Sequence, residues 1–366
     1  MVISNAQKLQ SIILLFSFWN SAFANQEADY KIKNICPQNI IESNDGKTLY
    51  VSEQGDQYNK YYQEFDLLSG KKQSTKLEDY RYGSYSWSRG GSEVIQYSYI
   101  AAYYNQEGIE VLRPSTGEVI WKTSYVPRYR PLKIESSFNF SPDNKIMVGT
   151  FLNKVHVDLP YFLESIMLWD FRNQKLLKRF DLESTWYRGP IDGGVSPSGK
   201  TFFQFSFFKW KDDQGKVLPF RALRIDIEKQ TIEEFELPID FLEFPSIETL
   251  GPISDTKLFI RSGDSKLYIY DIEKKSYKLI GEFKNLIGNT ALKDNLIYFA
   301  DEEDSVLATE STIVVRTFDI NTGLIETKGS YPISNDRKAA YFDLTSYHLL
   351  IGDEMCEELS VFNLPH

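Results

Sequence analysis

The sequence predicts an all-β fold made of repeated antiparallel units, and three observations carry this prediction. Aromatic residues form 15% of the chain, with 23 Tyr and 25 Phe, and such side chains favour strands. After the first 24 residues, no long stretch shows the periodicity of a helix. Two kinds of short unit recur along the chain at a nearly regular spacing, which is typical of a repeat architecture.

The first recurring unit is a polar turn between two stretches rich in β-forming residues. Asp, Asn, Gly and Ser in such turns supply the geometry of tight hairpins. The sequence contains SNDGKTLYV from Ser43, WSRGGSEVI from Trp87, FSPDNKIMV from Phe140, VSPSGKTFF from Val195, ISDTKLFI from Ile253, LKDNLIYF from Leu292 and ISNDRKAAYF from Ile333. Each of these turns is predicted to join the first two strands of a repeat.

The second recurring unit is an apolar strand that ends in an acidic or polar residue and is followed by a turn. Aligned on that residue, its copies fall at positions 66, 113, 170, 226, 271, 319 and 363, which are 44 to 57 residues apart. Seven repeats of this length predict the four-stranded blades of a seven-bladed β-propeller. We expect one such domain over residues 25–366, because a large all-β domain can reach this length.

One repeat carries a resemblance to a known group of proteins. FSPDNKIMVGT from Phe140, followed by IMLWDFRNQKLLKRF from Ile166, resembles a WD-type repeat. The chain from residue 25 onward resembles WD-repeat-like and quinoprotein-like seven-bladed propellers. It departs from ordinary WD repeats because Trp169-Asp170 is its only Trp-Asp pair and the Gly-His dipeptide is missing from every unit.

The strand order of that group implies how the two chain ends meet. Blade strands run a, b, c, d from the central channel outward, and the chain ends in VFNLPH, which would be strand c of the last blade. The resemblance implies that residues 30–36 supply the missing strand d and close the ring. Cys36 and Cys356 would then meet in a disulfide, and the alternative is two buried free thiols.

The N-terminal residues have the pattern of a secretory signal peptide. Lys8 is followed by the apolar run Ser11 to Trp19 and by Ala22-Phe23-Ala24, an A-x-A cleavage site. No later apolar run reaches the roughly 20 residues that a membrane helix needs. We therefore expect residues 1–24 to be removed and the mature protein to be exported, to a bacterial periplasm or out of the cell.

Three similar stretches pair Tyr with Arg and are the main candidates for a binding site. With a net charge of −10 and a pI near 5.1, the chain presents no general surface for nucleic acid. The three stretches precede the hairpins of the second, third and fourth repeats, so they fall on d–a connections at or beside the channel mouth. Arginine there would suit a carboxylate or a phosphate, and a neighbouring aromatic ring would add a flat apolar surface. The candidate residues are Tyr80, Arg81, Tyr129, Arg130, Trp186, Tyr187 and Arg188. The alternative is that these pairs brace one blade against the next.

Long b–c connections of the third and fourth repeats would rise on the same face. They contain Tyr161, Phe162 and Trp210, aromatic residues of the kind that anchor protein interfaces, although exposed aromatics of ordinary hairpins would look the same. A third connection, ADEEDSVLATES from Ala300, lacks the spacing of a calcium loop, so we expect a solvated acidic loop.

Motifs for catalysis, metal binding or a cofactor are absent from the sequence. The three His, at 156, 348 and 366, have no metal-binding spacing, and no G-x-S-x-G elbow occurs. The adjacent cysteines of quinone-dependent dehydrogenases are missing as well. We therefore expect an exported non-catalytic propeller without a cofactor, which binds a protein, a peptide or an anionic ligand. The alternatives are a propeller hydrolase or lyase with carboxylates and arginines at the channel mouth, and a scaffold subunit of a periplasmic dehydrogenase or envelope complex.

Overall fold

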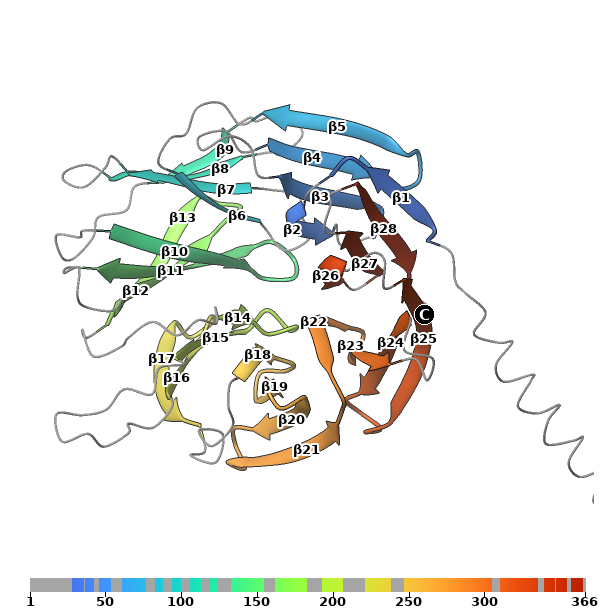
Figure 1. Ribbon diagram of the computed structural model, residues 1–366. Helices are drawn as coiled ribbons and strands as arrows, with labels where there is room; N and C mark the ends of the chain where they lie inside the picture. Colours follow the sequence, from blue (N-terminus) through green and yellow to red (C-terminus); the bar gives the residue numbers. More distant parts are fainter. Residues whose placement is uncertain are drawn as a thin grey trace, which may run out of the picture. The chain divides into compact units, whose positions relative to one another are not determined.

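The regular structure of the protein is β-strand throughout the described part of the chain. The structure is a computed structural model, shown in Figure 1, and the residues it describes are 28–35, 37–42, 46–53, 61–76, 83–87, 94–99, 106–112, 119–123, 133–154, 162–182, 193–206, 221–237, 247–304, 310–334, 339–345, 347–353 and 357–364. The strands form seven four-stranded antiparallel sheets within these residues. This confirms the all-β prediction and the four-stranded repeat.

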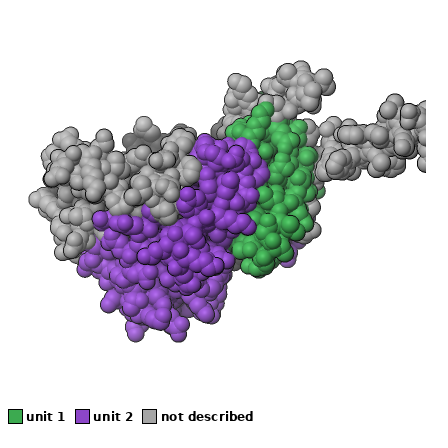
Figure 2. Space-filling view, turned by 90° about the horizontal axis from the view of Figure 1, so that it is seen from below, with its two compact units in different colours: residues 1–36, 284–366 green, residues 37–283 purple. Residues whose placement is uncertain are grey.

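The chain divides into two compact units, coloured separately in Figure 2. Unit 1 contains residues 1–36 and 284–366, and unit 2 contains residues 37–283. We number the sheets in chain order, so that sheets 1 to 5 belong to unit 2 and sheets 6 and 7 to unit 1.

The five sheets of unit 2 each take four consecutive strands. Their bounds are β2 (Pro37–Glu42), β3 (Thr48–Glu53), β4 (Tyr61–Asp66) and β5 (Lys71–Lys76) in sheet 1; β6 (Gly83–Trp87), β7 (Val94–Tyr99), β8 (Gln106–Leu112) and β9 (Val119–Thr123) in sheet 2; β10 (Lys133–Phe140), β11 (Ile146–Lys154), β12 (Phe162–Asp170) and β13 (Lys175–Asp181) in sheet 3; β14 (Gly194–Val195), β15 (Thr201–Ser206), β16 (Arg221–Asp226) and β17 (Thr231–Glu236) in sheet 4; and β18 (Ile247–Pro252), β19 (Lys257–Ser262), β20 (Lys266–Asp271) and β21 (Ser276–Glu282) in sheet 5.

Unit 1 contains the two sheets that involve the C-terminal strands. Their bounds are β22 (Leu286–Lys293), β23 (Leu296–Asp304), β24 (Glu310–Asp319) and β25 (Ile325–Ser334) in sheet 6, and β26 (Ala339–Leu344), β27 (His348–Asp353), β28 (Glu358–Asn363) and β1 (Tyr30–Lys33) in sheet 7. The N-terminal strand β1 thus forms the outer edge of sheet 7, paired with β28 from Tyr30↔Val361 to Lys33↔Glu358. The predicted pairing of the two chain ends is confirmed at the level of this sheet.

Hydrophobic cores lie between four pairs of consecutive sheets in the described residues, which is why their middle strands are largely buried. One cluster joins Ile109 and Trp121 of sheet 2 to Phe138, Phe151 and Trp169 of sheet 3. Similar clusters join sheets 3 and 4, sheets 4 and 5 and, in unit 1, sheets 6 and 7. In unit 2, β10 lies beside both β6 and β14, and β14 lies beside β18. First strands packed side by side with cores between sheets are the arrangement of propeller blades.

The turn after the third strand of a sheet has a repeated construction. Asp66, Asp170, Asp226, Asp271 and Asp319 each end a third strand, and a carboxylate oxygen of each accepts backbone N–H bonds from residues two or three further on. The fourth residue after each Asp has a positive φ, between 50° and 74°, at Gly70, Gln174, Gln230, Lys275 and Gly323. The acidic positions aligned from the sequence are therefore equivalent in these five turns.

Six of the seven predicted hairpin turns lie between the first two strands of a sheet, and the seventh prediction is wrong. ISNDRKAAYF spans the end of β25, the connection 335–338 and the start of β26. The hairpin of sheet 7 is formed instead around Tyr347, where the N–H of Thr345 donates to the carbonyl oxygen of His348 at 2.9 Å. That turn has no Gly, Asp or Asn, and Ser346 is its only residue of the types that identified the others.

Candidate functional site

Most of the predicted site residues lie outside the described residues. These are Tyr80, Arg81, Tyr129, Arg130, Tyr161, Trp186, Tyr187, Arg188 and Trp210, as well as Cys36 and Cys356. Phe162 is the first residue of β12, and its Cα pairs with that of Asn153. The strand bounds place the three Tyr-Arg stretches between β5 and β6, between β9 and β10, and between β13 and β14, which are the expected d–a connections.

In sheets 1, 3 and 4 of unit 2, the connections at one end of the sheet are longer than those at the other. Tight turns, such as 67–70, 171–174, 227–230 and 272–275, join the strands at one end. The other end carries longer connections such as 54–60, 124–132, 155–161 and 207–220. We call these the turn end and the loop end of a sheet. All the predicted binding residues belong to the loop end.

A buried polar cluster lies at the loop end of sheet 3. The Glu164 side chain is fully buried, the Asn153 amide donates to it, and a guanidinium nitrogen of Arg179 lies 3.6 Å from its carboxylate. Glu164 stands at a β-bulge, because the register between β11 and β12 shifts beside Leu152. A carboxylate buried this deeply needs such partners, since desolvation disfavours an isolated charge. The cluster therefore holds together, by polar contacts, the strand ends on either side of residues 155–161.

A second buried carboxylate lies at the loop end of sheet 6, in unit 1. Asp301 is 3% exposed, accepts a 2.9 Å bond from the N–H of Asn285 and lies 3.7 Å from Arg316, which also pairs with Glu303. The predicted solvated acidic loop is therefore wrong for its first part. Residues 300–304 belong to β23, where Arg316 and Asn285 compensate the carboxylates. Across the described ranges, no group of three His, Cys, Asp or Glu side chains is placed to hold a metal ion.

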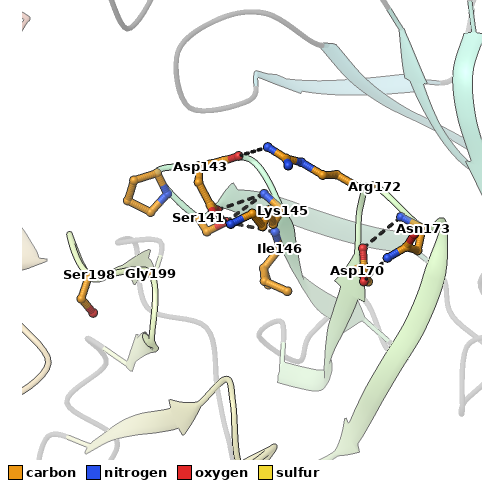
Figure 3. A pocket seen from close by; sticks show the side chains of 10 residues that line it. Ser141, Asp143, Lys145, Ile146, Asp170, Arg172, Asn173, Ser198 and Gly199 are labelled. Atoms are coloured by element: carbon orange, nitrogen blue, oxygen red, sulfur yellow. Dashed lines mark hydrogen bonds and ion pairs between the residues drawn. The ribbon is translucent and has the colours of Figure 1, made fainter.

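A polar pocket of about 340 Å³ lies at the turn end of unit 2, between sheets 3 and 4. Three turns line it: Ser141 to Ile146 between β10 and β11, Asp170 to Asn173 between β12 and β13, and Ser198-Gly199 between β14 and β15 (Figure 3). The aliphatic parts of Pro142 and Ile146 add apolar wall. This volume falls in the range of sites for small ligands or single side chains.

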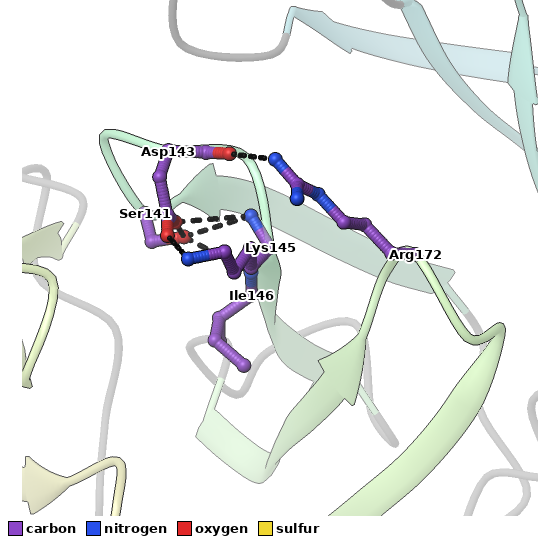
Figure 4. Close-up of polar contacts among 5 residues, drawn as sticks. All are labelled: Ser141, Asp143, Lys145, Ile146 and Arg172. Carbon is purple, nitrogen blue, oxygen red and sulfur yellow. Dashed lines mark hydrogen bonds and ion pairs between the residues drawn. The ribbon is translucent and has the colours of Figure 1, made fainter.

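The carboxylate of Asp143 in this pocket is fully engaged by its own turn (Figure 4). It accepts from the Ser141 hydroxyl at 2.7 Å and from the Lys145 N–H at 3.1 Å, and it forms a 2.6 Å ion pair with the Lys145 ammonium. The hydrogen bond from the Lys145 side chain, followed by that from Ser141, lowers the pKa of Asp143 to about 2. Asp170 is held in the same way by Asn173, whose side-chain amide donates at 2.8 Å and lowers the pKa of that carboxyl.

Sequence reasoning missed this pocket because its parts come from three separate turns. One feature of the sequence could have pointed to it. Arg172 follows Asp170 by two residues, and the equivalent positions in the other described turns hold Leu68, Glu228, Glu273 and Asn321. An arginine at this place occurs only in sheet 3 among the five turns that the structure describes.

An equivalent junction one sheet further on is closed by a protein carboxylate. Asp255, in the hairpin turn of sheet 5, accepts hydrogen bonds of 2.6 Å from the hydroxyls of both Ser196 and Ser198 in the hairpin turn of sheet 4. Burial raises the pKa of Asp255, but the bonds from Ser196 and Ser198 outweigh it and leave the pKa lowered. The turn end can therefore bind a carboxylate between two consecutive hairpin turns.

Comparison with known proteins gives structural matches only. No family model matches the chain, and no curated protein matches its sequence. Three solved structures are similar: a chain of the mitotic checkpoint complex (TM-score 0.52, 11% identity, 94% of this chain and 93% of that one), the β-propeller domain of Cps50 (Swd1) from Myceliophteria thermophila (0.51, 12%, 92% and 99%), and the β-propeller domain of the Trilobed protease from Pyrococcus furiosus (0.50, 14%, 81% and 81%).

Identities this low establish the fold alone. The region of similarity extends over most of the chain, and two of the matched domains are β-propellers by name. Among the residues that the structure describes, no helix has the length and apolar character needed to cross a membrane. The repeat pattern, the four-stranded sheets and these similarities agree that the protein is a β-propeller resembling the WD-repeat type.

Proposed function

We propose that this protein is an exported, non-catalytic β-propeller that binds a protein, a peptide or an anionic ligand with the loop end of its sheets. The observation that carries the proposal is the unequal length of the connections at the two ends of sheets 1, 3 and 4. Tight turns at one end make a rigid scaffold, and long connections at the other are where binding residues usually reside. WD-repeat-like propellers serve widely as interaction scaffolds, which supports the proposal by analogy of fold.

The Tyr-Arg stretches would supply the main contacts of this surface. Arg81, Arg130 and Arg188 belong to connections that enter three consecutive sheets, so the three guanidinium groups would have related positions. Each presents a planar fork of donors suited to carboxylate or phosphate, with Tyr or Trp beside it. Tyr161, Phe162 and Trp210 would add aromatic anchors from the neighbouring connections.

The proposal includes a complete ring of seven blades. Sheets 1 to 7 would be these blades, and β1 would close the ring as the outer strand of sheet 7. Small-angle scattering of the mature protein tests the ring, because a single disc and two separate units give different distance distributions.

The signal peptide over residues 1–24 would deliver the chain to a periplasm or to the medium.

The binding surface is tested by comparing two triple variants of the mature protein. The first is Arg81→Ala, Arg130→Ala, Arg188→Ala at the loop end. The second is Lys71→Ala, Lys229→Ala, Lys274→Ala, which removes the same charge at the turn end from exposed side chains, where ion pairs contribute little. Both must keep the circular dichroism and Tm of the wild type.

We expect a partner captured from periplasmic extract, and its Kd measured with the purified partner, to be retained by the turn-end variant. The same partner should bind the loop-end variant at least tenfold more weakly, because charge-assisted contacts are lost. Equal affinity of the two variants would contradict the proposal and leave the Tyr-Arg pairs as contacts between blades.

A further inference from the structure

The outer strands of the sheets differ in how their edges are protected from pairing with a further strand. The strands β9, β13, β21 and β25 each pair with their neighbour through a shift of register of the kind that a β-bulge makes. The outer strand of sheet 7, β1, is only four residues long. Bulges and short strands are two of the ways in which proteins prevent exposed edges from associating.

The outer strands β5 and β17 have neither feature. Each is six residues long and pairs with its neighbour along its whole length without a shift of register. They are the outermost strands of sheets 1 and 4 (Figure 1), and no strand of the described residues pairs with their outer edges. Each edge therefore presents a row of backbone N–H and C=O groups with which another strand can pair.

These two regular edges carry charge of opposite sign. The sequence of β5, KKQSTK, has three lysines and no acidic residue, whereas that of β17, TIEEFE, has three glutamates and no basic residue. Like charges placed opposite each other destabilise a pair of strands, so β5 is protected from β5 of another copy and β17 from β17. The same charges favour the pairing of β5 with β17.

The charges of β17 remain available at the surface. Glu234 lies 3.2 Å from Arg221 and Glu233 lies 3.9 Å from Arg224 in the neighbouring strand β16, but all three glutamates of β17 are exposed. Exposed ion pairs of this kind contribute little, so they do not hold the glutamates back from a second partner. Glu236 forms no ion pair with the described residues.

An antiparallel pairing of the two strands in full register brings unlike charges together. Lys71 would lie opposite Glu236 of the second copy. On the other face of the sheet, Glu233 of the second copy would lie diagonally between Lys72 and Lys76, within the reach of such long side chains. No two like charges would be opposite each other in this register.

We propose that copies of this protein associate edge to edge, with β5 of one copy paired to β17 of a second copy. The pairing would join the four strands of sheet 1 to the four strands of sheet 4 in one continuous sheet. Every copy has both edges, so the contact is heterologous and continues into a ring or a chain of copies. It uses none of the loop-end residues, so it is independent of the binding function proposed above.

Sedimentation velocity of the mature protein tests this association. At an ionic strength of about 0.01 M, where charges act over about 30 Å, we expect the average mass to rise with protein concentration. At about 1 M, where that distance falls to about 3 Å, the Kd of association should be at least tenfold higher. A mass of one chain at every concentration up to the solubility limit, or association that strengthens with salt, would overturn the proposal.

Two charge-reversed variants identify the strands responsible. Each alone would have two edges of like charge and should associate at least tenfold more weakly than the wild type. An equimolar mixture should associate like the wild type, because each β5 then meets a β17 of opposite charge. The variants, which must keep the circular dichroism and Tm of the wild type, are Lys71→Glu, Lys72→Glu, Lys76→Glu in β5 and Glu233→Lys, Glu234→Lys, Glu236→Lys in β17. Wild-type association of either variant alone, or no recovery in the mixture, would overturn the proposal.

The matched control changes the net charge equally at the outer strand of sheet 5, whose register is shifted. This variant, Lys274→Glu, Lys275→Glu, Lys278→Glu, should associate like the wild type. A loss of association equal to that of the β5 variant would show that overall charge, not the pairing of β5 with β17, controls the association, and would overturn the proposal.

Discussion

At the residue scale, Gly193 shows how closely the backbone packs at the start of sheet 4. A Cβ placed on Gly193 would lie 2.1 Å from the backbone oxygen of Phe203, whereas one placed on Gly251 would meet nothing within 4 Å. We expect Gly193→Ala to lower the free energy of unfolding by about 2 to 3 kcal/mol, because the clashing atom belongs to backbone and cannot rotate away. Gly251→Ala, within β18, is the control and should change stability by less than about 0.5 kcal/mol. Urea unfolding of both variants checks this, and equal effects would contradict the packing described.

The hydroxyl of Tyr331 in unit 1 is a buried polar group without a hydrogen-bond partner in the described part of the structure. The side chain is 0% exposed, its ring packs at 5.0 Å against Phe362, and burial raises the pKa of its hydroxyl to about 12. We expect Tyr331→Phe to keep or raise the free energy of unfolding, by up to about 1 kcal/mol, because an unpaired hydroxyl costs desolvation without a compensating bond. Phe362→Ala, in contrast, should cost about 3 kcal/mol or more through the cavity it leaves. A Tyr331→Phe variant destabilised by thermal unfolding would show that the hydroxyl has a partner.

At the scale of the element, the repeated turn after the third strand lets us predict stability changes of opposite sign for substitutions at two equivalent positions. Gly70 and Gln230 both have positive φ, 64° and 54°, but a side chain pays a steric cost in that region and glycine does not. Gln230→Gly should therefore raise the free energy of unfolding by up to about 1 kcal/mol, and Gly70→Ala should lower it by about 1 kcal/mol. No atom lies within 4 Å of a Cβ on Gly70, so the second effect comes from φ alone. Chemical denaturation of the two variants gives the signs, and like signs would argue against equivalent turns.

The aspartates of the same turns predict how stability depends on pH. The pKa of Asp66 and that of Asp319 are lowered chiefly by hydrogen bonds from the backbone N–H groups of Ser69 and Thr322, respectively. Because these pKa values are lower in the folded protein than in the unfolded chain, the turns contribute stability that is fully present above the unfolded pKa of about 3.9. That contribution is lost as the pH falls through the lower folded values.

We therefore expect the urea midpoint to fall between about pH 5 and pH 2, and Asp319→Asn to reduce the size of this fall. The asparagine cannot ionise, so its turn contributes nothing to the pH dependence. An unchanged pH profile in Asp319→Asn would show that other carboxylates dominate the acid transition.

The same elements show what the sequence could and could not predict. The residue types of a short segment were sufficient to predict most of the turns. Asp294 and Asn295, both at positive φ, form the tight hairpin that their residue types indicate. The last hairpin was missed because Thr345 to Tyr347 closes it without such residues. The pocket at Arg172, the bridge from Asp255 to Ser196 and the buried Glu164 depend on contacts between separate strands or turns, which no local pattern specifies.

At the scale of the whole molecule, the paired ends of the chain predict a disulfide. The pairing of Lys33 with Glu358, extended by the 2.8 Å bond from the N–H of Asn34 to the carbonyl oxygen of Glu357, brings together the segments that lead to Cys36 and Cys356. A bond between these cysteines would close a loop of 319 intervening residues, worth about 5 kcal/mol in the chain-entropy model. We expect no free thiol in the denatured, unreduced mature protein, and a lower Tm after reduction. Two titrated thiols would refute the bond.

The β1–β28 pairing also has a consequence for the order of events during biosynthesis. The strand of sheet 7 that leaves the ribosome first finds its partner in the strand that leaves last. Sheet 7 therefore stays without its outer edge until both strands have emerged, however early the other sheets form. In the export that we propose, sheet 7 would therefore lack this edge strand pairing until β28 has crossed the membrane.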